Sequence, residues 1–231
     1  MSECAVLNRL YDTLFAAYGP QHWWPGETPF EVMVGAVLTQ NTNWQNVERA
    51  IGNLKEARLL DPRRLNRLPV NRLARLIRPA GYYNIKARRL KALVRWLVAR
   101  GGGRAETAFR GELAARRKEL LGIFGVGPET ADSILLYAGN RRTFVVDAYT
   151  RRILSRHGIV PPDAAYDEIK AMFESRLPRD VRLYNEYHAL LVRLAKENCR
   201  TVPLCESCPA HGMFDAAARP PRIAVKEKAH A

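Results

Sequence analysis

The sequence predicts an all-α fold. Apolar residues recur at helical spacing through most of the 231 residues, while strand-like alternation is scarce. Short Pro and Gly breakers interrupt the apolar stretches, among them Gly19-Pro20, Asp61-Pro62 and Pro161-Pro162. We therefore expect about ten helices and no sheet.

Three apolar stripes mark the clearest helices in chain order. Each repeats with the helical period, so its members share one helix face. The stripes are Leu7, Leu10, Tyr11 and Leu14; Leu90, Leu93, Val94 and Leu97; and Leu190, Leu191, Leu194 and Ala195. Beyond them, Pro220-Pro221 and scattered charges predict a flexible tail over residues 219–231.

The charge balance indicates an anionic partner. The chain has 37 Lys and Arg against 23 Asp and Glu, a formal net charge of +14 and a pI of about 10.1. Such an imbalance favours a polyanion, whose binding weakens steeply with salt. The basic residues cluster in Arg63–Arg78, Lys86–Arg104 and Arg116–Lys118, interleaved with Leu and Val, which predicts helices with a basic face. A merely basic soluble protein is the alternative.

No membrane or export signal is visible in the sequence. No apolar run approaches the roughly 18 residues that a membrane helix needs. Met1–Leu10 lacks the charged start and apolar centre of a signal peptide. We expect a cytoplasmic protein, associated with the nucleoid if it is bacterial.

A glycine turn that opens a helix is the most informative local feature. Gly125 and Gly127, within Leu121–Ala131, can take positive φ and carry no Cβ, so the amides of the turn can approach a ligand closely. Pro128 suits the first position of a helix, and a helix start favours an anion. Together with the net charge, this predicts that the turn holds a DNA phosphate.

This turn, taken with Val145–Arg152 downstream, resembles the helix-hairpin-helix glycosylase superfamily of base-excision repair, the relatives of endonuclease III. Val37–Thr42 resembles the family segment that bears a glutamine near the DNA, and Gly81–Ala87, with its glycine, aromatic residues and Lys-Ala pair, resembles the start of a family helix. A cysteine-rich stretch near the end resembles the family's iron–sulfur loop. The resemblance therefore covers most of the chain.

The resemblance implies two helical domains with the DNA cleft between them. A six-helix domain with the helix-hairpin-helix would occupy about residues 28–137. A second helical domain would join residues 1–27 to residues 138–218 and would carry the catalytic aspartate and the cysteine loop.

Asp147 is the carboxylate that the resemblance places at the reaction. It follows Val145-Val146 and precedes a predicted helix, as the family's catalytic aspartate does. Base removal breaks a C1′–N bond through an oxocarbenium-like transition state, which a carboxylate can stabilise while it helps to direct a water. A helix N-cap is the alternative, and both roles can hold together because a helix start favours an ionised carboxylate.

Glu129 occupies the position of the family's lyase lysine. Bifunctional members place a lysine two residues after the second hairpin glycine, where it attacks the sugar and leads to strand cleavage. A carboxylate cannot form an imine, so we expect a monofunctional glycosylase. Lys86 and Lys196 are other lysines that could reach the sugar.

The resemblance also implies the DNA contacts. Gln40 would enter the gap that the flipped nucleotide leaves; a surface glutamine at a helix end is its alternative. Arg151 faces either phosphate or solvent. The expected contacts are Gln40, Phe124, Gly125, Val126, Gly127, Thr130 and Arg151.

Tryptophans are the expected walls of the base pocket. Trp23-Trp24-Pro25, together with Leu38–Thr42, resembles the 3-methyladenine glycosylase branch of the endonuclease III-like group, and Trp44 lies close by in sequence. A flipped base is held between flat groups, and a cationic alkylated purine gains a cation–π interaction on Trp faces. Core or interdomain packing of these tryptophans is the alternative.

The cysteine loop suggests a metal. Cys199, Cys205 and Cys208 lie within ten positions, which in a reducing compartment indicates metal binding before a disulfide. In the family four cysteines of such a loop hold a [4Fe–4S] cluster. Here no fourth cysteine follows, so His211, Cys4 or an exogenous ligand would complete the set. A loop without a cluster is the alternative, and a zinc ribbon is less favoured because only one paired knuckle is present.

We therefore expect a monomeric, monofunctional glycosylase that flips a damaged base, such as 3-methyladenine, from double-stranded DNA and hydrolyses its N-glycosidic bond. A bifunctional glycosylase–lyase acting on oxidised pyrimidines is the first alternative. A non-catalytic DNA-binding module is the second. His157 and His188 lie in helical contexts, where packing is the usual role, and we assign them no chemistry.

Overall fold

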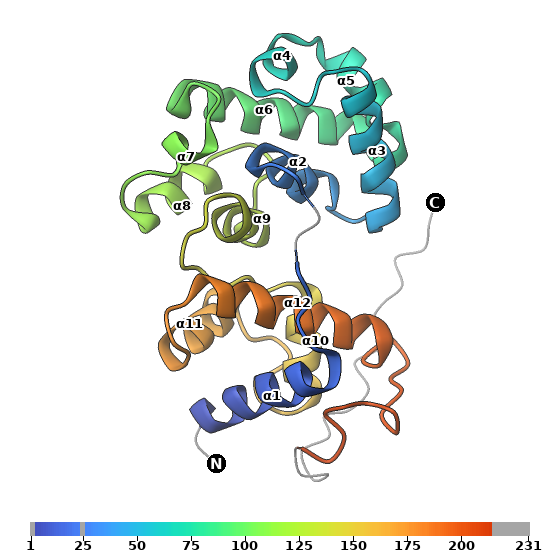
Figure 1. Cartoon of the computed structure of the whole chain (residues 1–231), viewed down its shortest axis with the longest axis vertical. Coiled ribbons are helices and arrows are strands. Elements are labelled where there is room, and N and C mark those ends of the chain that lie inside the picture. The colour runs from blue at the N-terminus through green and yellow to red at the C-terminus, as the bar shows by residue number, and fades with distance from the viewer. Residues whose placement is uncertain (1–2, 24–25, 214–231) are drawn as a thin grey trace. The chain divides into compact units, whose positions relative to one another are not determined.

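The protein is helical throughout the part of the chain that the structure describes. The computed structural model describes the backbone of residues 3–23 and 26–213, with side chains from residue 5 onward (Figure 1). These residues form twelve α-helices, two shorter helical segments and no strand. The predicted all-α fold is confirmed, whereas the predicted tail at 219–231 lies outside the described residues. No helix within those ranges is long and apolar enough to cross a bilayer.

The chain divides into two compact units. The central unit is Trp24–Thr143, and the terminal unit joins Met1–Trp23 to Phe144–Ala231. The central unit contains α2 (Pro29–Leu38), α3 (Trp44–Glu56), α4 (Pro62–Arg67), α5 (Val70–Leu76), η1 (Arg78–Ala80), α6 (Tyr83–Gly101), α7 (Ala105–Ala108), α8 (Leu113–Leu121), α9 (Pro128–Ser133) and η2 (Ile134–Ala138). The terminal unit contains α1 (Glu3–Tyr18), α10 (Ala148–Arg156), α11 (Tyr166–Arg176) and α12 (Val181–Glu197).

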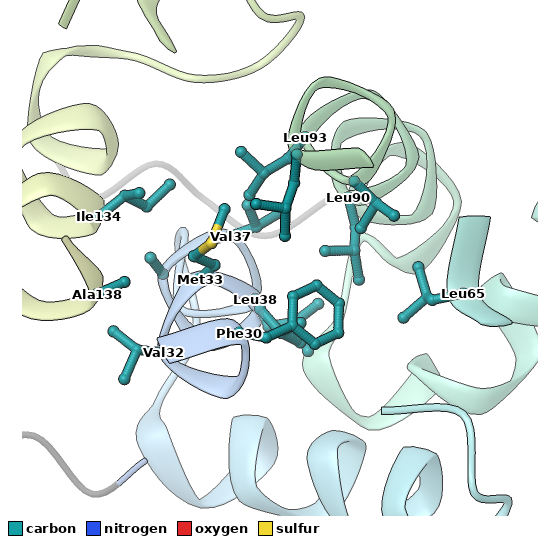
Figure 2. Close-up of a cluster of buried hydrophobic side chains, with 14 of the residues drawn as sticks. Phe30, Val32, Met33, Val37, Leu38, Leu65, Leu90, Leu93, Ile134 and Ala138 are labelled. Carbon is teal, nitrogen blue, oxygen red and sulfur yellow. The ribbon is translucent and has the colours of Figure 1, made fainter. Parts of the chain in front are cut away.

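Helix α2 forms the centre of the central unit's core. Thr28 caps its start by accepting a backbone amide of the first turn at 3.1 Å. Every residue from Phe30 to Leu38 is buried, as expected for a helix whose residues are apolar except for Glu31. The end of α2, directly before Gln40, is therefore held by packing on every face. Figure 2 shows the surrounding side chains of Leu65, Leu90, Leu93, Ile134 and Ala138.

A buried lysine joins the end of α2 to the start of α6. Lys86 is 1% exposed, and its Nζ donates to the carbonyls of Leu38 at 2.8 Å and Ala80 at 2.7 Å. These carbonyls end α2 and η1, where helix carbonyls lack intrahelical partners. Burial, followed by the nearby charge of Arg89, lowers the pKa of Lys86 to about 8. The ammonium therefore serves as a C-terminal cap for two helical segments at once.

The terminal unit is built around α12. This helix packs against α1 and α10. The Tyr187 hydroxyl donates to the Leu7 carbonyl at 2.8 Å, and the Phe144 ring stacks on Phe173 with centroids 3.9 Å apart. These contacts hold the segment before α10, which ends in Asp147, within the core of the terminal unit.

We expect Lys86→Met to lower the free energy of unfolding by about 2–4 kcal/mol. Methionine keeps much of the volume but leaves the carbonyls of Leu38 and Ala80 without their donor. Urea unfolding followed by circular dichroism measures the loss, with Lys118→Met at an exposed position of α8 as the matched control.

The same comparison has a pH signature. The folded pKa of about 8 lies below the value of 10.5 for a free lysine, so the unfolded chain binds more protons between these two values. Wild-type stability relative to Lys86→Met should therefore rise with pH across that window. A loss no larger than that of the control, with no pH dependence, would contradict the capping role.

Candidate functional site

The turn between α8 and α9 is a backbone loop with unpaired amides. Gly125 has φ +78, and Gly127 is extended and caps α9. The Val126 amide closes the turn on the Ile123 carbonyl at 3.0 Å. The amides of Phe124, Gly125 and Gly127 donate to no acceptor within the described residues. The turn therefore has three donors available for an anion, directly before a helix start.

Glycine is required at position 125 for two reasons. The positive φ disfavours any residue with a Cβ. In addition, a Cβ at this position would lie 2.2 Å from Cγ of Arg89. At Gly127, by contrast, a Cβ would meet nothing within 4 Å. Arg89 therefore packs directly on the turn and places a guanidinium next to it.

Gln40 braces this turn from the end of α2. Its Nε2 donates to the Gly125 carbonyl at 3.0 Å and to the Thr130 hydroxyl at 2.9 Å. Its Oε1 accepts from Arg89 Nη1 at 2.6 Å. The structure thus brings together Gln40, Gly125 and Thr130, which the sequence analysis placed at the DNA. The amide of Gln40 is fully used within the protein, a role that the sequence analysis did not include.

The other predicted residues of the turn, and the two alternative lysines, differ in their exposure to solvent. Phe124 is 58% exposed at the tip, Glu129 is exposed on the first turn of α9, and Val126 is buried. Of the alternative lysines, Lys86 is buried with its Nζ on two carbonyls, which removes it as a nucleophile. Lys196 lies in the terminal unit, exposed on α12.

Tyr82 is an exposed aromatic residue that the sequence analysis passed over. It is 68% exposed and has φ +44, directly after Gly81 at φ +66. A bulky residue in the left-handed region is uncommon and marks a constrained segment. Because Lys86 ties the neighbouring Ala80 carbonyl to that of Leu38, this ring lies near the end of α2. It offers a flat face on which a base can stack.

The tryptophans expected at the base pocket have different surroundings. Trp44 begins α3, packs partly buried on the core of the central unit and donates from Nε1 to Glu48 at 2.7 Å. Trp23 lies in the terminal unit, where the Lys196 ammonium is 5.7 Å from its ring centroid. Trp24 lies outside the described residues.

Asp147 caps α10 through one carboxylate oxygen. Oδ1 accepts from the Thr150 amide at 2.7 Å and from the Thr150 hydroxyl at 2.8 Å. Oδ2 lies 3.6 Å from Nε2 of His188, and the side chain is 14% exposed. Burial raises the pKa of Asp147, but the interaction with His188 and the two Thr150 hydrogen bonds outweigh burial and leave the pKa below its usual value. The carboxylate is therefore ionised at neutral pH.

The arginines after Asp147 make contacts within the terminal unit. Arg151 Nη1 donates to the Ala164 carbonyl, so this predicted DNA contact is half-buried and used to hold the segment before α11. Arg152 donates to the Ala195 carbonyl at 3.3 Å.

Comparison with known proteins identifies the family. A family model described as HhH-GPD superfamily base excision DNA repair protein matches residues 34–179, which span both the glycine turn and Asp147. The chain belongs to the HhH-GPD superfamily. The predicted resemblance to endonuclease III-like helix-hairpin-helix glycosylases is confirmed, and the protein is a base-excision-repair DNA glycosylase.

Two curated relatives and two solved structures illustrate the similarity. A protein of Methanocaldococcus jannaschii, provisionally named a DNA repair glycosylase, is 51% identical over 88% of this chain and 93% of its own length. Endonuclease III of Thermotoga maritima is 31% identical over 78% of this chain and 79% of its own. The 3-methyladenine DNA glycosylase of Helicobacter pylori, solved with 1,N6-ethenoadenine, has a TM-score of 0.72 and 28% identity over 85% of this chain and 98% of its own. An endonuclease III–DNA complex shares the fold, with a TM-score of 0.76 and 23% identity over 90% and 94%.

In this HhH-GPD protein the cysteine loop after α12 is held by hydrogen bonds. Arg156 donates to Cys199 Sγ at 3.4 Å, to the Thr201 carbonyl at 2.9 Å and to the Arg200 carbonyl. Asn198 donates to Ser207 Oγ at 3.1 Å. Helix α10 and the end of α12 therefore anchor the loop directly.

The three cysteines that the resemblance assigns to a [4Fe–4S] cluster differ in exposure. Cys199 is buried, Cys208 is half-buried and Cys205 is exposed. His211, one of the three candidates for the fourth ligand, has its Nδ1 2.7 Å from the Cys205 carbonyl. Within residues 5–23 and 26–213, no group of three or more Cys, His, Asp or Glu side chains is arranged to hold a metal ion. The Cys4 side chain lies outside the described part, and no chemical step is assigned to a cluster.

We expect Gly125→Ala to weaken DNA binding about tenfold, the equivalent of one hydrogen bond to phosphate. The added methyl must displace Arg89, and the residue must hold a left-handed conformation. Gly52→Ala on α3 is the matched control, because its Cβ also enters open space and the residue lies outside the turn. Fluorescence anisotropy with an undamaged duplex measures the two affinities. Equal affinities would show that the shape of the turn does not govern binding.

Arg156→Met should loosen the cysteine loop, seen as faster amide hydrogen exchange over residues 198–213. The variant loses three donors to the loop while keeping the aliphatic stem. Arg182→Met, at an exposed site on α12, is the control. Iron chelation of the wild-type protein tests whether a cluster also holds the loop. Loop exchange that accelerates on chelation, together with loss of iron–sulfur absorbance, would assign the anchoring to a cluster.

Proposed function

We propose that this glycosylase is monofunctional and that it acts, as a monomer on double-stranded DNA, on alkylated purines such as 3-methyladenine. One observation carries the proposal. Asp147 is held ionised at the start of α10 with one oxygen bound to the helix and the other free of it. A fixed anion of this kind stabilises positive charge that develops on a sugar.

Phosphate binding at the glycine turn would position the DNA. The three unpaired amides around Phe124–Gly127 and the guanidinium of Arg89 supply donors and positive charge. Such contacts carry no sequence information, so little sequence preference is expected. The net charge of +14 makes binding strongly salt-dependent.

Hydrolysis would use the carboxylate of Asp147 without covalent chemistry. The C1′–N bond breaks with its electron pair leaving on the base, and water oxygen bonds to C1′. The developing oxocarbenium charge is stabilised by the ionised carboxylate. A cationic alkylated base leaves as a neutral molecule, so it needs little help from an acid, and the proton lost by water passes to solvent.

Strand cleavage would be absent because the family's lyase position carries a carboxylate. Glu129 stands on α9 where bifunctional members carry the attacking lysine. Lys86, the alternative on the same unit, is buried and caps two helical segments. The reaction would therefore end at an abasic site with the DNA strand intact.

The substrate class is supported by the aromatic residues and by one relative. Trp23 already has a cation over its ring, the ammonium of Lys196 at 5.7 Å, and a cationic purine would interact with a Trp face in the same way. The Helicobacter pylori relative is named a 3-methyladenine DNA glycosylase. The second candidate, a bifunctional enzyme for oxidised pyrimidines, is favoured by the Thermotoga maritima relative named endonuclease III.

A lesion panel tests the proposal. Duplexes carrying 3-methyladenine, 7-methylguanine or thymine glycol are incubated with the enzyme and analysed with and without alkali. We expect release of the methylated purines, with strand breaks only after alkali. Asp147→Asn should reduce excision at least about 100-fold while leaving DNA affinity within about twofold.

The other outcomes separate the alternatives. Release of thymine glycol, with strand breaks before alkali, would establish the bifunctional enzyme. Tight binding of every duplex with no released base would favour a binding module without excision. Near-normal excision by Asp147→Asn would remove Asp147 from the reaction.

A further inference from the structure

His188 lies beside Asp147 although the two residues are far apart in sequence. It is on α12, is 5% exposed, and its Nε2 is 3.6 Å from Asp147 Oδ2. This distance is longer than a hydrogen bond but short enough for a strong electrostatic interaction in a buried site. The sequence analysis gave His188 a packing role, and the structure adds a charged neighbour.

The two oxygens of Asp147 have separate neighbours. Thr150 supplies both hydrogen bonds to Oδ1. His188 faces Oδ2, the oxygen that the helix does not use. A reaction at the exposed edge of this carboxylate would therefore depend on how His188 sets the position and charge of Oδ2.

The apolar surroundings do not explain an imidazole at this position. The neighbours of His188 on the buried face of α12 include Tyr184, Tyr187 and Leu191, all at most 1% exposed. A phenyl or leucine side chain would pack among them without the cost of burying a polar ring. The carboxylate of Asp147 is a charged neighbour of the ring, at 3.6 Å from its Nε2.

Several charged and titratable groups on the neighbouring elements have contacts of their own. Those on α10 and α11 bond to backbone groups, and one acidic residue of α1 lies beside a tyrosine. These groups are Arg151 on the Ala164 carbonyl, Arg152 on the Ala195 carbonyl, Tyr166 accepting the Val146 amide, and Asp12 beside Tyr187.

We propose that His188 is the positioning residue for Asp147, holding Oδ2 so that the carboxylate stays ionised and turned towards the reacting sugar. This inference rests on the proposed function. In the hydrolysis, the attacking water bonds to C1′ and loses a proton while the base departs with the C1′–N electron pair. His188 touches neither water nor sugar; it acts through the oxygen of Asp147 that it faces.

If His188 positions Asp147, replacing His188 should slow base excision, and a matched set of variants tests this. In single-turnover excision of the preferred base, His188→Phe should reduce the rate about 10- to 100-fold. DNA affinity should stay within about twofold, because the residue is buried away from DNA. His188→Gln, which keeps a donor in a similar volume, should restore part of the rate. His157→Phe, the same change at the histidine that follows α10 in the terminal unit, controls for general destabilisation.

The pH profile separates positioning from packing. Without His188 the pKa of Asp147 rises, because an interaction that lowers it is gone while burial, which raises it, stays. The acidic limb of the excision rate should therefore move to higher pH in His188→Phe. In an Asp147→Asn background, His188→Phe should cause no further loss. A rate that falls equally in the Phe and Gln variants, with an unmoved acidic limb, would mean packing alone and overturn the inference.

A measurement without DNA keeps this inference distinct from the proposed function. Carboxyl carbon NMR of Asp147 reports its titration directly in the full-length protein. We expect a higher pKa for Asp147 in His188→Phe than in the wild type, whichever base the enzyme removes. An unchanged Asp147 titration overturns the pairing even if methylated purines are released. A shifted titration in a protein that excises none of the panel supports the pairing and rejects the proposed substrate class.

Discussion

The geometry of the central unit depends on one buried ammonium. Lys86 joins the carbonyl that ends α2 to the carbonyl that ends η1. This fixes the segment after α2, where Gln40 begins its contacts, relative to α6, which carries Arg89. Gln40 and Arg89 then hold the glycine turn through Gly125. Packing of α2, capping by Lys86 and bracing by Gln40 thus form one chain of contacts that ends at the unpaired amides.

In the terminal unit, the carboxylate of Asp147 stays ionised although it is mostly buried. Burial alone would favour the protonated acid. Thr150 offsets this through Oδ1, and His188 does so through Oδ2. Because α10 and α12 each contribute one side of this arrangement, the packing of two helices determines the charge state of the carboxylate. Capping and catalysis are therefore compatible uses of Asp147.

Features that depend on neighbouring residues could be predicted from the sequence, whereas features that depend on contacts between distant residues could not. The all-α fold, the turn at Gly125 and the capping by Asp147 follow from periodicity, glycine and Asp at a helix start. His188 could not be connected with Asp147, because their proximity depends on how α12 packs against α10. The bracing by Gln40 was hidden for the same reason, since it spans 85 residues to Gly125. Tyr82 had a visible signal, an aromatic residue after a glycine, but its exposure emerges only from the fold.

Glu129 connects the proposed lack of lyase activity with the charge of the proposed substrate. In bifunctional members the corresponding lysine attacks the sugar, and its ammonium form would also repel a base that already carries positive charge. A carboxylate at the same position removes the nucleophile and, being anionic, attracts such a base instead. A cationic purine is in addition a good leaving group, so the loss of covalent assistance costs the reaction little. One substitution on the first turn of α9 thus favours both features of the proposed reaction, hydrolysis without strand cleavage and preference for an alkylated base.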